Sequence, residues 1–410
     1  MSPTRTTLLV TAALVTALGA WPSAPAPAPG PRASAELDGS GACTFPAPQI
    51  KGRPWPLQRV LLDQLWQGTN RGKGVRVAVI DTGVDDKNPQ LAAAVDKAAG
   101  RDYLTKGKGG DPTNDEVGHG TKVAGIIAAR QHSDTGFVGL APNATIIPIR
   151  QNDADNSGDS DTMADAITYA VSKGADVINI SQDTTKPLSA TSALAEAVRK
   201  AIAAKVVVVA SAGNDGLDGK TKKTYPAAFP GVLAVASSDR NNERAGFSQA
   251  GSFVGVAAPG VDIVSTVPGG GQCTDNGTSF SAPFVAGVAA LLKEKHPDWS
   301  TAQIVTQIEQ TAERSINGHD NYVGWGVVDP VRAVQESDID DPPSVPVPDP
   351  GPARAAAPDV APFSLAETAQ ERDERYATYG LGIALVVVVI ITGITVVARD
   401  LRRNRKDLQP

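Results

Sequence analysis

Short apolar runs alternate with longer helical patterns through the middle of the chain. The runs are rich in β-branched residues, which is typical of strands buried on both faces, and they lie at Val75–Ile80, Ala144–Ile149, Asp176–Ile180, Lys205–Ala210 and Val232–Ala236. Helices are predicted between several of these runs, over Thr121–Arg130, Thr162–Lys173 and Ala190–Ala204. The alternation of strand and helix predicts an α/β fold, with a parallel sheet flanked by helices and right-handed crossovers.

The amino-terminal end carries an apolar run of another kind. Leu8–Ala20 follows a basic residue and has the pattern of a secretory signal peptide. A Pro- and Ala-rich lead-in comes next, so residues 1–35 are assigned to signal and lead-in. Cleavage after Gly19 or Ala20, or later after Ala35, agrees equally well with the sequence. We therefore expect the chain to be exported.

The carboxy-terminal apolar run is longer. Leu381–Ala398 is uncharged and, with its flanks, matches the roughly 20 residues that cross a bilayer. A buried core helix is the alternative, but basic residues follow the run at once, at Arg399, Arg402, Arg403, Arg405 and Lys406. By the positive-inside rule we predict one transmembrane helix over residues 379–398 and a basic cytoplasmic tail over residues 399–410, which leaves the globular part outside the membrane.

Composition sets the remaining boundaries. The chain turns acidic and rich in Pro and Ala, without apolar periodicity, over residues 336–378, which predicts a linker. Within it, Leu365–Ala369 resembles a signal for covalent attachment to the cell wall, although such signals have Gly where Ala369 stands. Wall attachment is the alternative to a membrane anchor. Residues 36–66 are predicted to be an N-terminal extension, and residues 67–335 a single globular domain.

Charge and cysteine content narrow the function. The net charge of -6, from 38 Lys and Arg against 44 Asp and Glu, provides no basic field for nucleic acid, so nucleic-acid binding is disfavoured. The only two cysteines, Cys43 and Cys273, lie in the predicted exported part. An even pair in an oxidising compartment predicts one disulfide, with two free thiols as the alternative. This bridge would tie the N-terminal extension to the loop just before Ser279.

Four polar residues carry candidate chemistry, and each also has an ordinary structural interpretation. Asp81 follows an apolar run, at the sheet edge where the sites of α/β folds gather. His119 lies between two glycines at a predicted helix start, and Asn214 lies in a small-residue turn after a buried strand. Ser279 precedes an apolar helical run through Leu292, where it is either a helix cap or a nucleophile at the positive end of the helix.

Together these residues, in the order Asp, His, Asn, Ser, resemble the subtilisin-like serine proteases across about residues 57–334. The motifs that carry the resemblance are Asp81-Thr82-Gly83, His119-Gly120-Thr121-Lys122-Val123-Ala124-Gly125 and Gly277-Thr278-Ser279-Phe280-Ser281-Ala282-Pro283. The resemblance implies a subtilisin-like fold and acyl transfer on protein or peptide substrates, without a cofactor. In it, Ser279 is the nucleophile, His119 the general base, Asp81 the residue that orients the imidazole, and Asn214 an oxyanion donor.

The residues expected to bind the substrate depart from the sequence pattern of that family. Subtilisin-like enzymes continue into Ser-Leu-Gly where this chain has Ser181-Gln182-Asp183, so an amide and a carboxylate replace an apolar wall. With Gly213, these residues form the predicted substrate cleft. Our hypothesis is a narrow, polar specificity with Asp183 near a basic substrate residue, and the alternative is that Asp183 points to solvent. The acidic loop 152–161 is a candidate substrate rim or partner surface. It lacks EF-hand spacing, so no metal site is assigned.

The order of segments resembles the mycosins, the membrane-anchored subtilisin-like proteases of type VII secretion systems. A signal peptide, an extension, a protease domain, a Pro-rich linker, one transmembrane helix and a short basic tail follow one another, although mycosins often carry more than two cysteines. The resemblance implies a single-pass cell-membrane protease that processes exported proteins. It also implies a structural role in stabilising the secretion membrane complex, and the sequence leaves open which role is the main one.

Overall fold

The computed structural model describes residues 43–105, 110–154, 158–350 and 366–406. The predicted signal peptide and lead-in over residues 1–35 lie outside the described residues, as do parts of the acidic loop, of the predicted linker and of the basic tail. The chain divides into two compact units, Met1–Asp349 and Pro350–Pro410, which are described separately.

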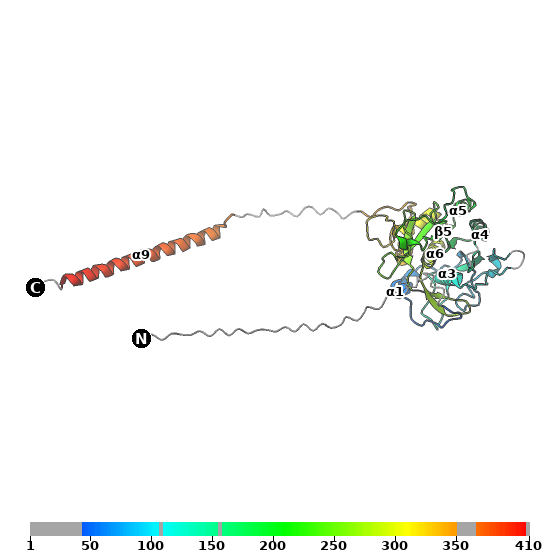
Figure 1. Cartoon of the computed structure of the whole chain (residues 1–410), viewed down its shortest axis with the longest axis horizontal. Helices are drawn as coiled ribbons and strands as arrows, with labels where there is room; N and C mark the ends of the chain where they lie inside the picture. Colours follow the sequence, from blue (N-terminus) through cyan, green and yellow to red (C-terminus); the bar gives the residue numbers. More distant parts are fainter. Residues whose placement is uncertain (1–42, 106–109, 155–157, 351–365, 407–410) are drawn as a thin grey trace, which may run out of the picture. The chain divides into compact units, whose positions relative to one another are not determined.

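The first unit is built on a parallel sheet with the strand order β2-β3-β1-β4-β5-β6-β7. Figure 1 labels one of these strands, β5, among the helices of this unit. The strands of this sheet are β1 (Arg76–Asp81), β2 (Arg101–Asp102), β3 (Thr145–Arg150), β4 (Val177–Ile180), β5 (Val207–Ser211), β6 (Leu233–Ser238) and β7 (Val254–Pro259). The central strand β1 pairs Val77 with Ile146 on one side and with Val177 on the other. A second, antiparallel sheet consists of β8 (Ile263–Thr266) and β9 (Gln272–Asp275).

Helices cover both faces of the large sheet. They are α1 (Trp55–Arg59), α2 (Leu62–Leu65), α3 (His119–Ala128), α4 (Ser160–Ser172), α5 (Ala193–Ala203), α6 (Thr278–Lys295), α7 (Thr301–Gln310) and α8 (Pro330–Gln335), with short 3₁₀ turns at Lys97–Ala99 and Gly216–Asp218. Along β1, Val77 and Val79 belong to the core formed with α3 and α6, whereas Ala78 and Ile80 belong to the core formed with α4 and α5. Because both faces are buried, the strands appear in the sequence as continuous apolar runs.

The predicted α/β architecture is confirmed, and the differences lie in the weaker elements. Helix α3 begins at His119 rather than at Thr121, and a capping box at Asp159 starts α4. Strand β7 was not predicted because its sequence, Val-Gly-Val-Ala-Ala-Pro, has few bulky residues. The β8–β9 pair was missed because β9 is polar (Gln-Cys-Thr-Asp).

The described part of the N-terminal extension is packed on the domain. Leu57 and Leu65 are buried in the core that contains α3 and α6, and the indole N–H of Trp66 donates to the Leu140 carbonyl at 2.8 Å. Cys43 and Cys273 form a disulfide with a Cα–Cα distance of 6.2 Å, which confirms the predicted bridge. The extension is therefore held to the domain by apolar packing and by a covalent bond close to α6.

Residues 337–349, which composition assigned to the linker, also lie on the first unit. Ser337 is buried and lies 2.8 Å from His296 Nε2, and Asp338 pairs with Lys295 at 3.0 Å. Arg314 pairs with Asp349 at 3.0 Å. These attachments use single polar side chains without an apolar period, so the sequence pattern did not reveal them.

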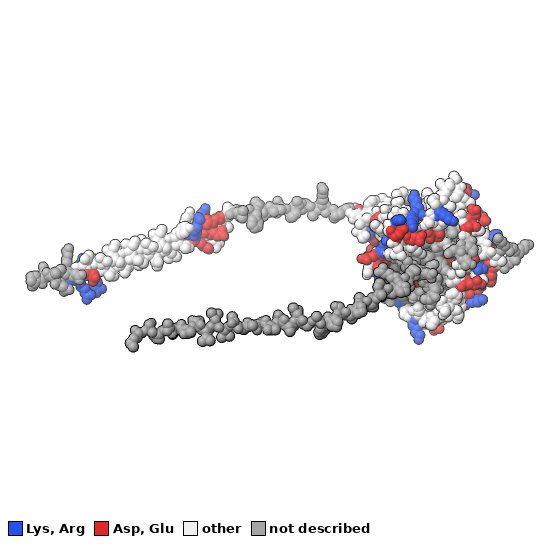
Figure 2. All heavy atoms as spheres, viewed as in Figure 1, with Lys and Arg blue, Asp and Glu red and all other residues white. Residues whose placement is uncertain are grey.

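The second unit contains one long helix, α9 (Ala369–Lys406). Its segment Ala369–Arg403 is long and apolar enough to cross a membrane, with a mean hydropathy of 2.9 in its most apolar stretch. Figure 2 shows uncharged side chains along the middle of α9 and charged ones only near its ends. The helix starts before the predicted span because Thr368 and Glu371 form reciprocal capping hydrogen bonds, at 2.9 and 3.2 Å.

Candidate active site

Asp81 and His119 meet at the carboxyl edge of the large sheet. Asp81 is the last residue of β1 and fully buried, and His119 is the first residue of α3. His119 Nδ1 lies 2.7 Å from Asp81 Oδ1, so Nδ1–H donates to the carboxylate and Nε2 is left to accept a proton. Burial alone would lower the pKa of His119, but the negative charge of Asp81 and the hydrogen bond to it outweigh burial, and the pKa is raised.

A buried carboxylate that the sequence did not single out, Asp115, holds this pair in place. One of its oxygens accepts from Thr82 Oγ1 at 2.7 Å and from Gly118 N–H at 2.8 Å. The other accepts from the N–H and the hydroxyl of Thr121, at 2.8 and 2.6 Å. Burial raises the pKa of Asp115 against these hydrogen bonds, which favour its charged form. Asp115 thus ties the end of β1 to the start of α3, from a loop position that gave no sequence signal.

Ser279 lies in the first turn of α6. The N-cap of this helix is Gly277, so the interpretation of Ser279 as a helix cap is wrong. Gly277 has φ 153°, and a Cβ added there would lie 3.0 Å from Ser279 Oγ and 3.5 Å from Asn214 Nδ2. A side chain at Gly277 would therefore crowd the Ser279 hydroxyl and the Asn214 amide at the positive end of α6.

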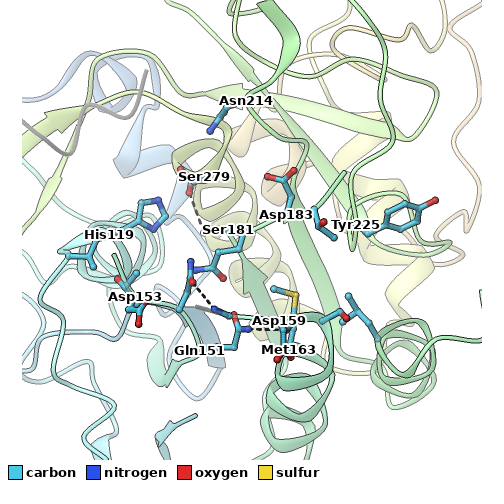
Figure 3. Close-up of a pocket in the computed structure, with 18 of the residues that line it drawn as sticks. His119, Gln151, Asp153, Asp159, Met163, Ser181, Asp183, Asn214, Tyr225 and Ser279 are labelled. Carbon is cyan, nitrogen blue, oxygen red and sulfur yellow. Dashed lines mark hydrogen bonds between the residues drawn. The ribbon is translucent and has the colours of Figure 1, made fainter. Parts of the chain in front are cut away.

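The amide of Asn214 is oriented by Thr278. Asn214 Oδ1 accepts from the N–H and from the hydroxyl of Thr278, both at 2.9 Å. The Nδ2 group therefore points the other way, toward Ser279 (Figure 3). Thr278 Oγ1 in turn accepts from Gly213 N–H at 3.2 Å. This anchoring role of Thr278 was not predicted, and its position next to Ser279 was the only signal.

His119, Asn214 and Ser279 line one cleft of about 730 Å³. Figure 3 shows His119 and Asp183 on opposite sides of Ser279, with Asn214 above it and Gln151, Asp159 and Met163 farther along the cleft. Predicted cleft residues Ser181, Gln182 and Asp183 do line it. Gly213 does not, but it lies behind Asp183, because a Cβ on Gly213 would be 3.0 Å from Asp183 Oδ2. Asp183 is itself exposed to solvent, so the structure agrees both with a carboxylate on the cleft wall and with the alternative that Asp183 points to solvent.

The Asp183 carboxylate keeps contact with solvent at the cleft mouth, yet protein surrounds it on its other sides. Its pKa is raised to about 6, first by this loss of water and second by the like charge of Asp215. Asp183 makes no hydrogen bond or ion pair with any residue that the structure describes. Within the same described part, no group of three or more His, Cys, Asp or Glu side chains is arranged to hold a metal ion.

Comparison with known proteins agrees with this geometry. The sequence profile of the Subtilase family matches residues 72–326. The chain belongs to the subtilase family. Subtilisin E of Bacillus subtilis (strain 168) is 38% identical over 283 residues, which cover 69% of this chain and 71% of that protein. Like subtilisin E, this subtilase is a subtilisin-like serine endopeptidase.

Solved structures relate this subtilase to the mycosins of type VII secretion. MycP1 from Mycobacterium smegmatis is 31% identical, with a TM-score of 0.63 over 77% of this chain and 92% of that one. MycP3 from an ESX-3 secretion system is 33% identical, with a TM-score of 0.62 over 70% and 91%. A chain of an intact ESX-5 inner membrane complex is 31% identical, with a TM-score of 0.61 over 86% and 92%.

A buried ion pair links the two halves of this subtilase site. Lys122 Nζ, on the first turn of α3, lies 2.6 Å from Asp275 Oδ2, at the end of β9. The two side chains are 2% and 4% exposed. Lys122 Nζ also lies 5.9 Å from the ring centre of Phe280, which follows Ser279. The pair therefore joins the helix that carries His119 to the segment that leads into α6.

Proposed function

We propose that Asp81, His119 and Ser279 are the catalytic triad of this endopeptidase, with Asn214 as oxyanion donor. Ser279 Oγ attacks the scissile carbonyl carbon while its proton passes to His119 Nε2. The carbonyl oxygen becomes an oxyanion that accepts from Asn214 Nδ2 and the Ser279 backbone N–H. His119 then protonates the leaving amine, and water releases the acyl group by the same steps in reverse order. The observation that supports this proposal most strongly is the 2.7 Å hydrogen bond between Asp81 and His119, because His119 lines the same cleft as Ser279 and Asn214.

Substitution of Ser279 tests this assignment. Ser279→Ala should lower kcat on peptides by about 10⁶-fold, the size established for the same loss in subtilisin. Labelling by a fluorophosphonate should disappear, while circular dichroism stays unchanged. Ser281→Ala is the matched control, because Ser281 is buried on the same helix and its Oγ has no hydrogen-bond partner among the described residues. Full activity in Ser279→Ala would refute the triad.

We further propose that the enzyme works outside the cytoplasm, anchored through α9, and processes proteins that a type VII system exports. The similarity to MycP1 and MycP3 and the membrane-length segment Ala369–Arg403 support this role. In intact cells, added proteinase K should digest a tag placed before residue 43 and spare a tag placed after residue 410. Digestion of the C-terminal tag alone would show that the chain has the opposite topology in the membrane.

A structural role in the secretion membrane complex is the second candidate. The observation that favours it is the similarity to a chain of the ESX-5 inner membrane complex, which covers 86% of this chain. Expression of Ser279→Ala in a deletion strain separates the two roles. Restored export together with unprocessed substrates would show that the fold alone supports the complex. Loss of export would tie secretion to proteolysis.

A further inference from the structure

The cleft wall beside Ser279 contains a carboxylate, that of Asp183, which makes no ion pair within the described part of the chain. Gly213 lies behind this carboxylate and does not line the cleft. Gly213 has φ +100°, and a Cβ there would lie 3.0 Å from Asp183 Oδ2 and 2.9 Å from Thr224 Cγ2. Asp183, with Gly213 behind it, therefore borders one part of the cleft beside Ser279, which we call the slot.

Hydrogen bonds hold the segments around Asp183 in place. Ser211 Oγ donates to the Ser181 carbonyl at 3.1 Å, and Thr224 Oγ1 donates to the Ala212 carbonyl at 2.8 Å. Thr184 and Tyr225 exchange two backbone hydrogen bonds, at 3.0 and 2.9 Å. A substrate side chain in the slot therefore meets Asp183 on a segment that hydrogen bonds hold in place.

The slot receives the side chain on the acyl side of the cut. His119 protonates the leaving amine in the proposed mechanism, so the leaving peptide lies on the side of His119. Asp183 lies on the other side of Ser279 (Figure 3). It consequently faces the residue that precedes the scissile bond.

The charge of Asp183 discriminates between substrates. An apolar side chain in the slot would remove water from an unpaired carboxylate, which is costly, whereas a cation would pair with it. A second acceptor on this wall, Gln182 Oε1, is buried and has no hydrogen-bond partner among the described residues. Charged groups near the slot are Asp215, which acts on Asp183 directly, and Asp153, Asp159 and Lys186 in the cleft lining.

From this arrangement, and resting on the protease function proposed above, we infer that Asp183 is a specificity-determining residue that selects Arg or Lys immediately before the scissile bond. The substrate class is thus peptides with a basic residue at the cut. This preference is opposite to that of an apolar slot, in which desolvation favours bulky hydrocarbon side chains.

Peptides that differ in one charge test the inference on the detergent-solubilised full chain. We would compare tetrapeptide amides of a fluorogenic amine with Arg, citrulline or Phe before the cut. Citrulline has nearly the shape of Arg without its charge. We expect kcat/KM for Arg to exceed that for citrulline by about 10 to 100-fold, the size of a charge-assisted hydrogen bond. In Asp183→Asn this ratio should fall to about 1.

Asp215→Asn is the matched control, because it removes a neighbouring carboxylate outside the cleft lining. Its Arg to citrulline ratio should stay within about 3-fold of wild type. An equal fall in both variants would overturn direct contact with Asp183, and a wild-type preference for citrulline or Phe would overturn the inference while leaving the protease intact. An enzyme that neither reacts with a fluorophosphonate nor cleaves any of the peptides would overturn the proposed function and this inference together.

Discussion

Two groups of residues meet at Ser279 and differ in how their polar side chains are bonded. In the catalytic cluster, which we define as Asp81, Asp115, His119, Asn214 and Thr278, every side chain bonds another side chain or the backbone, although Asp81 Oδ2 has no partner among the described residues. On the substrate wall, defined as Ser181–Asp183, Asp183 is unpaired and Gln182 Oε1 lacks a partner among the described residues. The cluster has its geometry before a substrate arrives, as electrostatic preorganisation requires, while the wall keeps its bonding capacity for the substrate.

The difference implies that substitutions in the two regions change different quantities. A change in the cluster should alter kcat or folding and leave the order of preferred substrates intact. A change on the wall should alter that order and leave the chemical step intact. A variant that changes both kcat and the order of preferred substrates would contradict this division.

The largest expected effect concerns the ion pair that supports the cluster. Lys122→Met leaves Asp275 buried without its partner, and loss of one partner of a buried pair costs about 3–5 kcal/mol of the free energy of unfolding. Urea unfolding in a Ser279→Ala background, which prevents self-digestion, measures this loss. The double variant Lys122→Met, Asp275→Leu should recover most of it, because no buried charge is left. A single variant as stable as wild type would show that the pair has no structural role.

The next effect concerns the oxyanion donor. Asn214→Ala should lower kcat by about 10² to 10³-fold, the magnitude known for the equivalent loss in subtilisin. Thr278→Val removes one of the two bonds that orient the Asn214 amide and keeps the N–H bond, so a smaller loss of about 10-fold is expected. Steady-state kinetics on the Arg and citrulline peptides measures both variants. In each variant, the ratio of kcat/KM for the Arg peptide to kcat/KM for the citrulline peptide should match the wild-type ratio. A changed ratio would contradict the division between cluster and wall.

The sequence predicted those parts of the site that are local in the chain. The motifs around Asp81, His119 and Ser279 place each residue at the start or end of an apolar element, so short patterns located them. Asp115 and the Lys122–Asp275 pair act across distant segments, and no local pattern reports which loop residue meets which helix. For Asp183, the replacement of an apolar wall was visible in the sequence, but its approach to Gly213 depends on how two strands end side by side.

The smallest effect concerns the substrate wall itself. The folded pKa of Asp183 is about 6 and the ordinary value is 3.8, so between these pH values the folded chain holds a proton that the unfolded chain releases. Ionised Asp183 therefore weakens folding as pH rises through this window. Asp183→Asn should melt at nearly the wild-type temperature at pH 4 and about 1–3 °C above it at pH 8, since contact with water screens the effect. Differential scanning calorimetry in the Ser279→Ala background measures this difference in melting temperature.

Asp159, which also lines the cleft, is a control because its pKa is shifted in the opposite direction from that of Asp183. Backbone hydrogen bonds from Thr162 lower the pKa of Asp159, so its ionised form stabilises the fold above its ordinary pKa, and this contribution is lost as pH falls through the lowered value. Asp159→Asn should therefore melt slightly below wild type at pH 8, with a gap that closes toward acid. If Asp183→Asn instead melted below wild type at pH 8, loss of water and the charge of Asp215 would no longer explain the raised pKa of Asp183, because removing a destabilising charge should stabilise the fold.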